Sequence, residues 1–301
     1  MVVSMPSANY LALNNIQLVT IAGEQMTVIS AVITQYCTVH ASDSLITKRK
    51  KGGLYESNEW EHSKIVPVHH WRGAMSYWGL AKHPVHNWST VDWLQDQVKS
   101  AGQESTPEEF AQRITDKLAE AISEMRFPQP VDSGIGIHFT AYEYIDNCWI
   151  PELFLISNWA NTNYQSLRPT GIGLSRETYH TIANVPPNPE HRDPQYRLRV
   201  HKHLHKPGSM IVYNNGDPHM FNIAAYAIFR LFKVLDMRGN LANPKQIKTY
   251  LAMASRPIEI ISSVQRDFGR KGTRIVGGKL HDLAITPGGE YYSTTGDDRA
   301  C

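Results

Sequence analysis

The sequence predicts an α+β protein built as a four-layer αββα sandwich, in which two antiparallel sheets stack face to face and a helix pair covers each outer face. The order of segments indicates this architecture: two hairpins, two helices, a third hairpin, a further strand, two helices and a closing hairpin. The short turns between successive strand segments favour antiparallel neighbours, and each helical segment needs a sheet face to cover its apolar residues.

The first hairpin is the best-defined element. Residues 28–33 are mostly apolar, 34–36 form a turn, and apolar residues at 37, 39 and 41 alternate with Thr38, His40 and Ser42. The second strand ends in Asp43. A basic loop, 48–53, then leads to Lys64 and the second hairpin, with strands at 65–68 and 73–78.

Two helices and a third hairpin follow. Ser89 with Asp92 forms a capping box for the first helix, and Thr106-Pro107 caps the second, whose apolar stripe belongs to the core. The third hairpin pairs 134–143 with 149–157 through a turn at 145–147.

Residues 158–207 predict a long insertion, because the stretch ANVPPNPEHRDPQ is rich in Pro, Asn and charge. His201, His203 and His205 share one face of an extended segment there. Three such histidines without a nearby Cys or carboxylate pair do not define a metal site, so we expect a polar edge or a subunit contact and no metal.

The C-terminal third supplies the remaining layers. A strand at 210–213 leads into a helix at 221–235 that is apolar nearly all round and must be covered on most sides. A second helix starts at Asn243-Pro244, and Pro257 should kink or divide it. Strands at 274–286 and 290–293 close the fold through Pro287-Gly288-Gly289.

Composition excludes several classes of protein. The chain has 301 residues, 42% hydrophobic and 19% charged, with no apolar run near the ~18 residues of a membrane span. The net charge of +2 is too small to argue for nucleic acid, and three scattered cysteines support neither disulfides nor a zinc ribbon. We therefore expect one domain in the cytoplasm, with no cofactor, no nucleic acid and no membrane.

The stretch from Thr27 to about Leu80 resembles the start of a mature proteasome β-type subunit, a member of the N-terminal-nucleophile (Ntn) hydrolases. Thr27, Asp43 and Lys64 fall on the family's three motif positions, and the spacing from Thr27 to Asp43 has no gap. About five extra residues precede Lys64, which we assign to the basic loop. The resemblance implies the four-layer Ntn-hydrolase fold.

The resemblance also implies an active site. A threonine at the start of a chain can use its own α-amine as the base for its hydroxyl. Lys64 would favour the neutral amine, and Asp43 would keep Lys64 charged and oriented. Gly79, or Trp78 one residue earlier, would supply the backbone N–H that binds the oxyanion of the intermediate.

Thr27 is internal in this sequence, so something must expose it. Either residues 1–26 are a propeptide removed by autoprocessing, or the true start is Met26 and its trimming leaves Thr27 first. Family propeptides usually end in Gly, so we favour the second account. Residues 27–301 then form a single domain, and the upstream segment has no secretory signal.

The functional prediction is a proteasome-type threonine protease that hydrolyses peptides or unfolded proteins in a homo-oligomeric ring. Substrate preference, ring size and any ATPase partner are not encoded in these patterns. A catalytically inactive ring subunit and a small-molecule amide hydrolase remain alternatives, because the family's supporting Asp and Ser match poorly. Aligned on Gly277-Gly278, the Ser position holds Val276 and the Asp position Thr273, although Asp267 could serve instead.

Overall fold

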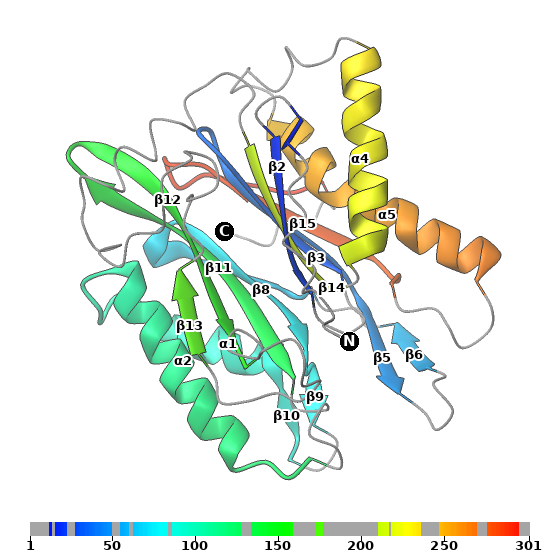
Figure 1. Ribbon diagram of the computed structural model, residues 1–301. Helices are drawn as coiled ribbons and strands as arrows, with labels where there is room; N and C mark the ends of the chain where they lie inside the picture. The colour runs from blue at the N-terminus through cyan, green and yellow to red at the C-terminus, as the bar shows by residue number, and fades with distance from the viewer. Residues whose placement is uncertain are drawn as a thin grey trace, which may run out of the picture.

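The computed structural model describes residues 12–13, 16–22, 28–49, 55–59, 63–83, 86–127, 134–158, 173–176, 210–216, 218–235, 247–269 and 276–294. Two large sheets stack face to face, with one helix pair outside each of them (Figure 1). The predicted four-layer α+β sandwich is therefore confirmed.

The first sheet has seven strands. Their spatial order is β1 (Ala12–Leu13), β2 (Ile16–Ala22), β14 (Met210–Gly216), β3 (Ile29–Thr34), β4 (Thr38–Asp43), β15 (Leu280–Ile285) and β16 (Tyr291–Tyr292). All neighbours are antiparallel except β2 and β14, which run parallel with Ile16 opposite Met210. The prediction of a purely antiparallel sheet is wrong at this pair, because it assigned no strand upstream of Thr27.

The second sheet has five strands and is antiparallel throughout. Its order is β13 (Gly173–Arg176), β12 (Cys148–Ser157), β11 (Ile135–Ile145), β8 (Gly73–Gly79) and β7 (Ile65–Val68), with the short helix η1 (His69–Trp71) between β7 and β8. The tight β11–β12 turn has positive φ at Asp146 and Asn147, as a two-residue hairpin requires.

Helices α1 (Thr90–Lys99) and α2 (Pro107–Ser123) cover the outer face of the five-stranded sheet. Both begin at the predicted caps: the Asp92 N–H donates to the Ser89 hydroxyl, and the Glu109 N–H donates to the Thr106 hydroxyl. The stripe on α2 packs into the core as predicted, with Phe110, Ile114 and Leu118 fully buried.

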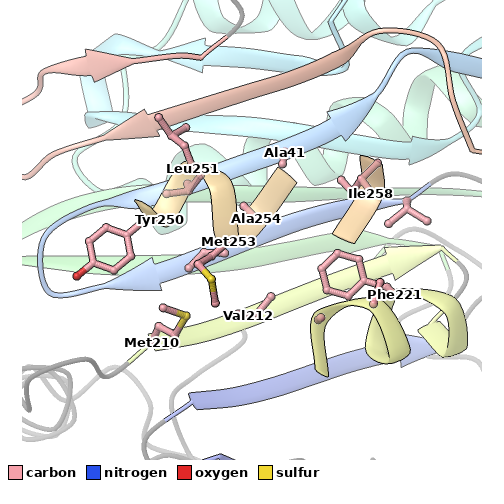
Figure 2. Packing of buried hydrophobic residues seen from close by; sticks show 14 of the residues in the cluster. Ala41, Met210, Val212, Phe221, Tyr250, Leu251, Met253, Ala254 and Ile258 are labelled. Carbon is pink, nitrogen blue, oxygen red and sulfur yellow. The ribbon is translucent and has the colours of Figure 1, made fainter. Parts of the chain in front are cut away.

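Helices α4 (Pro218–Val234) and α5 (Ile247–Phe268) cover the seven-stranded sheet. Figure 2 shows their buried contacts with β4 and β14, made by Ala41, Met210, Val212, Phe221, Tyr250, Leu251, Met253, Ala254 and Ile258. Because α5 continues through the buried Pro257, this proline does not divide the helix.

The outer face of α4 is open, which corrects the expectation that this helix is covered on most sides. Ile223, Val234 and Leu235 are 72%, 74% and 62% exposed. On the adjacent α5, Phe268 is 85% exposed. Within one chain, only the inner side of the helix pair is buried.

Some smaller elements were not predicted. Strands β5 (Leu45–Arg49) and β6 (Tyr55–Glu59) pair as a hairpin around the basic loop, and β9 (Lys82–His83) pairs with β10 (Trp88–Ser89). Strand β13 falls inside the predicted insertion, whereas His201, His203 and His205 lie outside the described residues. Among the helices described, none is long and apolar enough to span a membrane.

Candidate functional site

The structure brings Asp43 and Lys64 together at one end of the sandwich. Asp43 ends β4 in the seven-stranded sheet, and Lys64 directly precedes β7 in the five-stranded sheet. The Lys64 Nζ lies 2.9 Å from Asp43 Oδ1 and donates a second hydrogen bond to the Leu45 carbonyl oxygen at 2.7 Å. Both residues are buried, with 3% and 1% of their surface exposed, so the ion pair is shielded from solvent.

The second oxygen of Asp43 is also engaged. The Gly277 N–H donates to Asp43 Oδ2 at 2.8 Å, from the turn that leads into β15. The same turn is bound to the main chain after Asp43, because the Leu45 N–H donates to the Gly277 carbonyl oxygen at 3.0 Å. The closing Gly-Gly segment therefore helps to orient the carboxylate.

Gly278 permits this close approach. Its φ of +76° lies in the region that favours glycine, and a Cβ placed there would lie 2.3 Å from the Ser44 hydroxyl oxygen. That hydroxyl accepts a hydrogen bond from the Lys279 N–H at 2.8 Å. A side chain at position 278 would push this turn away from Asp43.

Burial and charge act in opposite directions on the Asp43 carboxyl. Burial raises its pKa above the ordinary value, whereas the Lys64 ammonium and the Gly277 N–H favour the ionised form. Each partner thus depends on the other: removing either charge would leave an uncompensated buried ion, which costs about 3–5 kcal/mol.

Gly79 ends β8, with a φ of +88°, opposite Ile135 on β11. Two residues earlier on β8, the Tyr77 N–H donates to the Lys64 carbonyl oxygen at 3.3 Å. Trp78, the alternative oxyanion donor, is buried and packs against Ile29 of β3. Gly79 therefore lies on β8, the strand whose Tyr77 N–H is bonded to Lys64. The role of Gly79 as an oxyanion donor stays a prediction.

Thr27 lies outside the described residues. Val28, the next residue, is fully buried, and Ile29 at the start of β3 lies opposite Ser42, which directly precedes Asp43. Strand β3 therefore starts beside the end of β4 that carries the ion pair.

Two of the candidate positions for the family's supporting Asp and Ser are described, and neither carries a supporting side chain at the ion pair. Val276, at the Ser position, is fully buried in the apolar cluster under α5, and its N–H donates to the Gln265 side chain. Asp267 lies at the exposed end of α5 and pairs with Arg266, so it does not support the ion pair as hypothesised. Thr273 lies outside the described residues.

Two contacts of the site were missed at the sequence level. The Leu45 carbonyl oxygen and the Gly277 N–H are backbone groups, so no side-chain pattern marks them. The Gly277-Gly278 pair, inside the predicted strand at 274–286, was the available signal for the second contact; in the structure the strand begins only at Leu280. Within the described ranges, no three or more His, Cys, Asp or Glu side chains are grouped to hold a metal ion.

Comparison with known proteins finds a likeness among solved structures. No family model matches the sequence, and no curated protein matches it either. Among solved structures, the chain is similar to Anbu (ancestral beta-subunit) from Yersinia bercovieri, at 13% sequence identity and a TM-score of 0.46. The likeness covers 90% of this chain and 88% of that one.

Proposed function

We propose that the protein is a threonine-type endopeptidase that cleaves peptides or unfolded proteins in the cytoplasm, with Thr27 as its nucleophile once this residue starts the mature chain. The observation that carries the proposal is the buried Lys64–Asp43 ion pair beside the start of β3. Thr27 is two positions before Ile29, the first residue of that strand.

The proposed chemistry assigns a separate task to each group. The free α-amine of Thr27 takes the hydroxyl proton as the oxygen attacks the peptide carbonyl. The nearby Lys64 ammonium favours the neutral, proton-accepting amine, and Asp43 holds that ammonium in place. The Gly79 N–H binds the oxyanion, and the α-ammonium gives its proton to the peptide nitrogen as the C–N bond breaks and the amine product leaves. Water then hydrolyses the ester on Thr27, which releases the acid product and restores the hydroxyl.

The burial of Lys64 supports a role for this residue in the chemistry. A buried ion pair contributes little net stability, because desolvation of both charges offsets their attraction, and apolar residues of similar volume often serve as well. At 3% exposure, Lys64 directs two of its three ammonium donors to the Asp43 carboxylate and the Leu45 carbonyl oxygen. A charge kept under such conditions favours a role in chemistry.

We further propose that the protein works as a homo-oligomeric ring. Support comes from the apolar outer face of α4 and α5, formed by Ile223, Tyr226, Leu231, Val234, Leu235, Ile260, Val264 and Phe268. Exposed apolar patches of this kind mark protein interfaces. A ring built through this face would explain why α4 is apolar on both sides.

A catalytically silent ring subunit is the second candidate. The buried Val276 favours it, because this residue puts an apolar side chain where the family has a hydroxyl. The ion pair would then be a structural remnant, and Thr27 would stay internal.

Mass spectrometry and a covalent probe test the proposal. The purified chain should lack residues 1–26, and a peptide epoxyketone should add to Thr27 through both its hydroxyl and its amine. Thr27→Ala should abolish the adduct and peptide hydrolysis, whereas Thr27→Ser, which keeps a hydroxyl, should retain both. Full hydrolysis by Thr27→Ala would contradict the proposal, and an unprocessed, inactive chain would favour the silent subunit.

A further inference from the structure

A hydrogen-bonded histidine connects the two sheets inside the sandwich. His40 projects from β4 in the seven-stranded sheet and is fully buried. Its Nδ1 lies 2.8 Å from the Ser76 hydroxyl oxygen on β8, and its Nε2 lies 2.8 Å from the Thr140 hydroxyl oxygen on β11. Both partners are fully buried and belong to the five-stranded sheet.

The hydroxyl protons determine which atoms of this cluster donate and which accept. Thr140 donates its hydroxyl proton to the Thr38 hydroxyl at 3.3 Å, so it must accept from His40 Nε2–H. In the neutral ring, Nδ1 then accepts from the Ser76 hydroxyl. Burial, together with a smaller effect of the neighbouring His138, lowers the pKa of His40 to about 3, so the ring is neutral near pH 7.

The cluster links the strand that ends in Asp43 to the strand that is paired beside Lys64. On one side, His40 is three residues from Asp43 along β4. On the other side, Ser76 lies directly opposite Ile65, the residue after Lys64, and the next N–H on β8, that of Tyr77, donates to the Lys64 carbonyl oxygen. The bond from His40 to Ser76 therefore joins the strand of Asp43 to the strand that holds Lys64.

The apolar contacts between the sheets are less directional than this hydrogen bond. Ile29 packs on Trp78, and a second apolar group contains Ile65, Ala74, Tyr142, Leu283 and Ile285. Apolar contacts are non-directional and tolerate small sliding of one layer over the other. Hydrogen bonds at 2.8 Å do not tolerate such sliding, because their strength falls steeply when donor and acceptor are misaligned.

We propose that His40 is a positioning residue that fixes the register of β4 against β8, so that Lys64 and Asp43 meet within hydrogen-bond distance. The consequence for catalysis rests on the proposed function, whereas the consequence for the geometry of the ion pair does not. A displacement of about 1 Å at a catalytic group can lower turnover by about 100-fold. The loss of this bond should therefore affect kcat more than KM.

The Lys64 ammonium signal in ¹⁵N-lysine NMR spectra reports the geometry directly, without any activity. Buried ammonium protons held by Asp43 and Leu45 exchange slowly, and Lys64→Arg assigns the resonance. His40→Leu and Ser76→Ala should each weaken or shift this signal and lower kcat about 10- to 100-fold. His40→Asn, whose side-chain oxygen can replace Nδ1 toward Ser76, should restore both.

Tyr142→Phe is the matched control. It removes the hydroxyl that donates to the Ile285 carbonyl oxygen at 3.4 Å and also bonds to Thr38, so it changes a contact between the sheets at the end of β4 opposite Asp43. It should lower stability and leave the Lys64 signal and kcat unchanged. If His40→Leu does not fold, Ser76→Ala, which only removes a hydroxyl, decides the test.

The possible results separate the two proposals. An unchanged Lys64 signal in folded His40→Leu or Ser76→Ala would overturn the positioning role. A wild-type protein without peptidase activity, but with a Lys64 signal that responds to these variants, would refute the proposed function and support the positioning role.

Discussion

Lys64 and Asp43 form a buried ion pair, with Nζ and Oδ1 2.9 Å apart, although 21 positions separate them and each belongs to a different sheet. The pair therefore depends on how the two sheets stack. Any change that separates the sheets at this end also separates the two charges.

Lys64→Ala should lower the free energy of unfolding by about 3–5 kcal/mol, because it leaves Asp43 buried without a counter-charge. Turnover should fall by orders of magnitude, and Lys64→Arg should rescue it poorly, since a planar guanidinium does not fit a site built for an ammonium. Urea unfolding and peptide hydrolysis measure the two effects. Lys99→Ala, which removes an exposed ion pair with Asp96, should change neither quantity appreciably. Wild-type stability in Lys64→Ala would contradict the burial of the pair.

Gly278→Ala should destabilise the protein by about 2 kcal/mol or more, because the new Cβ meets the Ser44 hydroxyl and the positive φ disfavours alanine. Gly288→Ala is the control, since a Cβ there finds only an ordinary contact with Thr286 at 3.5 Å. Thermal unfolding of both variants tests this expectation. Equal melting temperatures for the two would show that the turn around Asp43 is not tightly packed.

Acid should destabilise the fold well before its carboxylates are all protonated. Burial lowers the pKa of both His40 and His138 to about 3, from an ordinary value of 6.5. Between those values the unfolded chain binds protons at these positions and the folded chain does not, so the free energy of unfolding falls as the pH falls from about 6.5 toward 3. Each histidine contributes up to about 1.4 kcal/mol per pH unit in that window.

Urea unfolding across pH 4–7 measures this slope. His138→Gln should make this slope shallower, because one of the two buried neutral rings is then absent. A pH-independent free energy of unfolding across the window would mean that the two buried rings are not neutral in the folded protein.

The two cysteines in the described residues should react very differently with thiol reagents. Burial raises the pKa of Cys37 to about 12, which leaves almost no thiolate at neutral pH, whereas Cys148 is exposed at the start of β12. Iodoacetamide followed by peptide mapping should modify Cys148 within minutes and Cys37 only after denaturation. Rapid labelling of native Cys37 would show that the β3–β4 hairpin opens readily.

Charged substitutions on the outer face of α4 should dissociate the assembly. Val234→Lys and Leu235→Glu place charges on residues that are 74% and 62% exposed, so the chain should still fold. Light scattering at micromolar concentration should show a large species for the wild type and a smaller one for each variant. Lys117→Glu on α2, outside the apolar face, should keep the wild-type size. A wild-type monomer would exclude the ring.

The local patterns predicted most of the fold. Strong alternation and short turns defined the hairpins, and the caps at Ser89 and Thr106 were confirmed because capping depends on a few adjacent residues. Local chemistry determines the hairpins and the caps, so the sequence shows them directly. The pair of Asp43 and Lys64 was predicted from the resemblance of both residues to motif positions, and the structure brings the two together.

Features that depend on the stacking of layers were not predictable in the same way. Thr38, His40 and Ser42 alternate with apolar residues. This pattern is typical of a strand with one solvent-exposed face. In the structure that polar face is fully buried against the second sheet, where His40 finds Ser76 and Thr140. Partners 36 and 100 positions away leave no periodic trace in the sequence.

The parallel pairing of β2 with β14 bears on how Thr27 could become a chain start. Residues 16–22 hydrogen-bond along the whole of β14. A precursor that was cut before Thr27 could keep this strand as a bound, detached peptide. A chain that began at Met26 would never have it, and the Met210–Gly216 main chain would form an open sheet edge able to pair with any extended polypeptide. The two origins of the mature chain would therefore yield proteins with different surfaces.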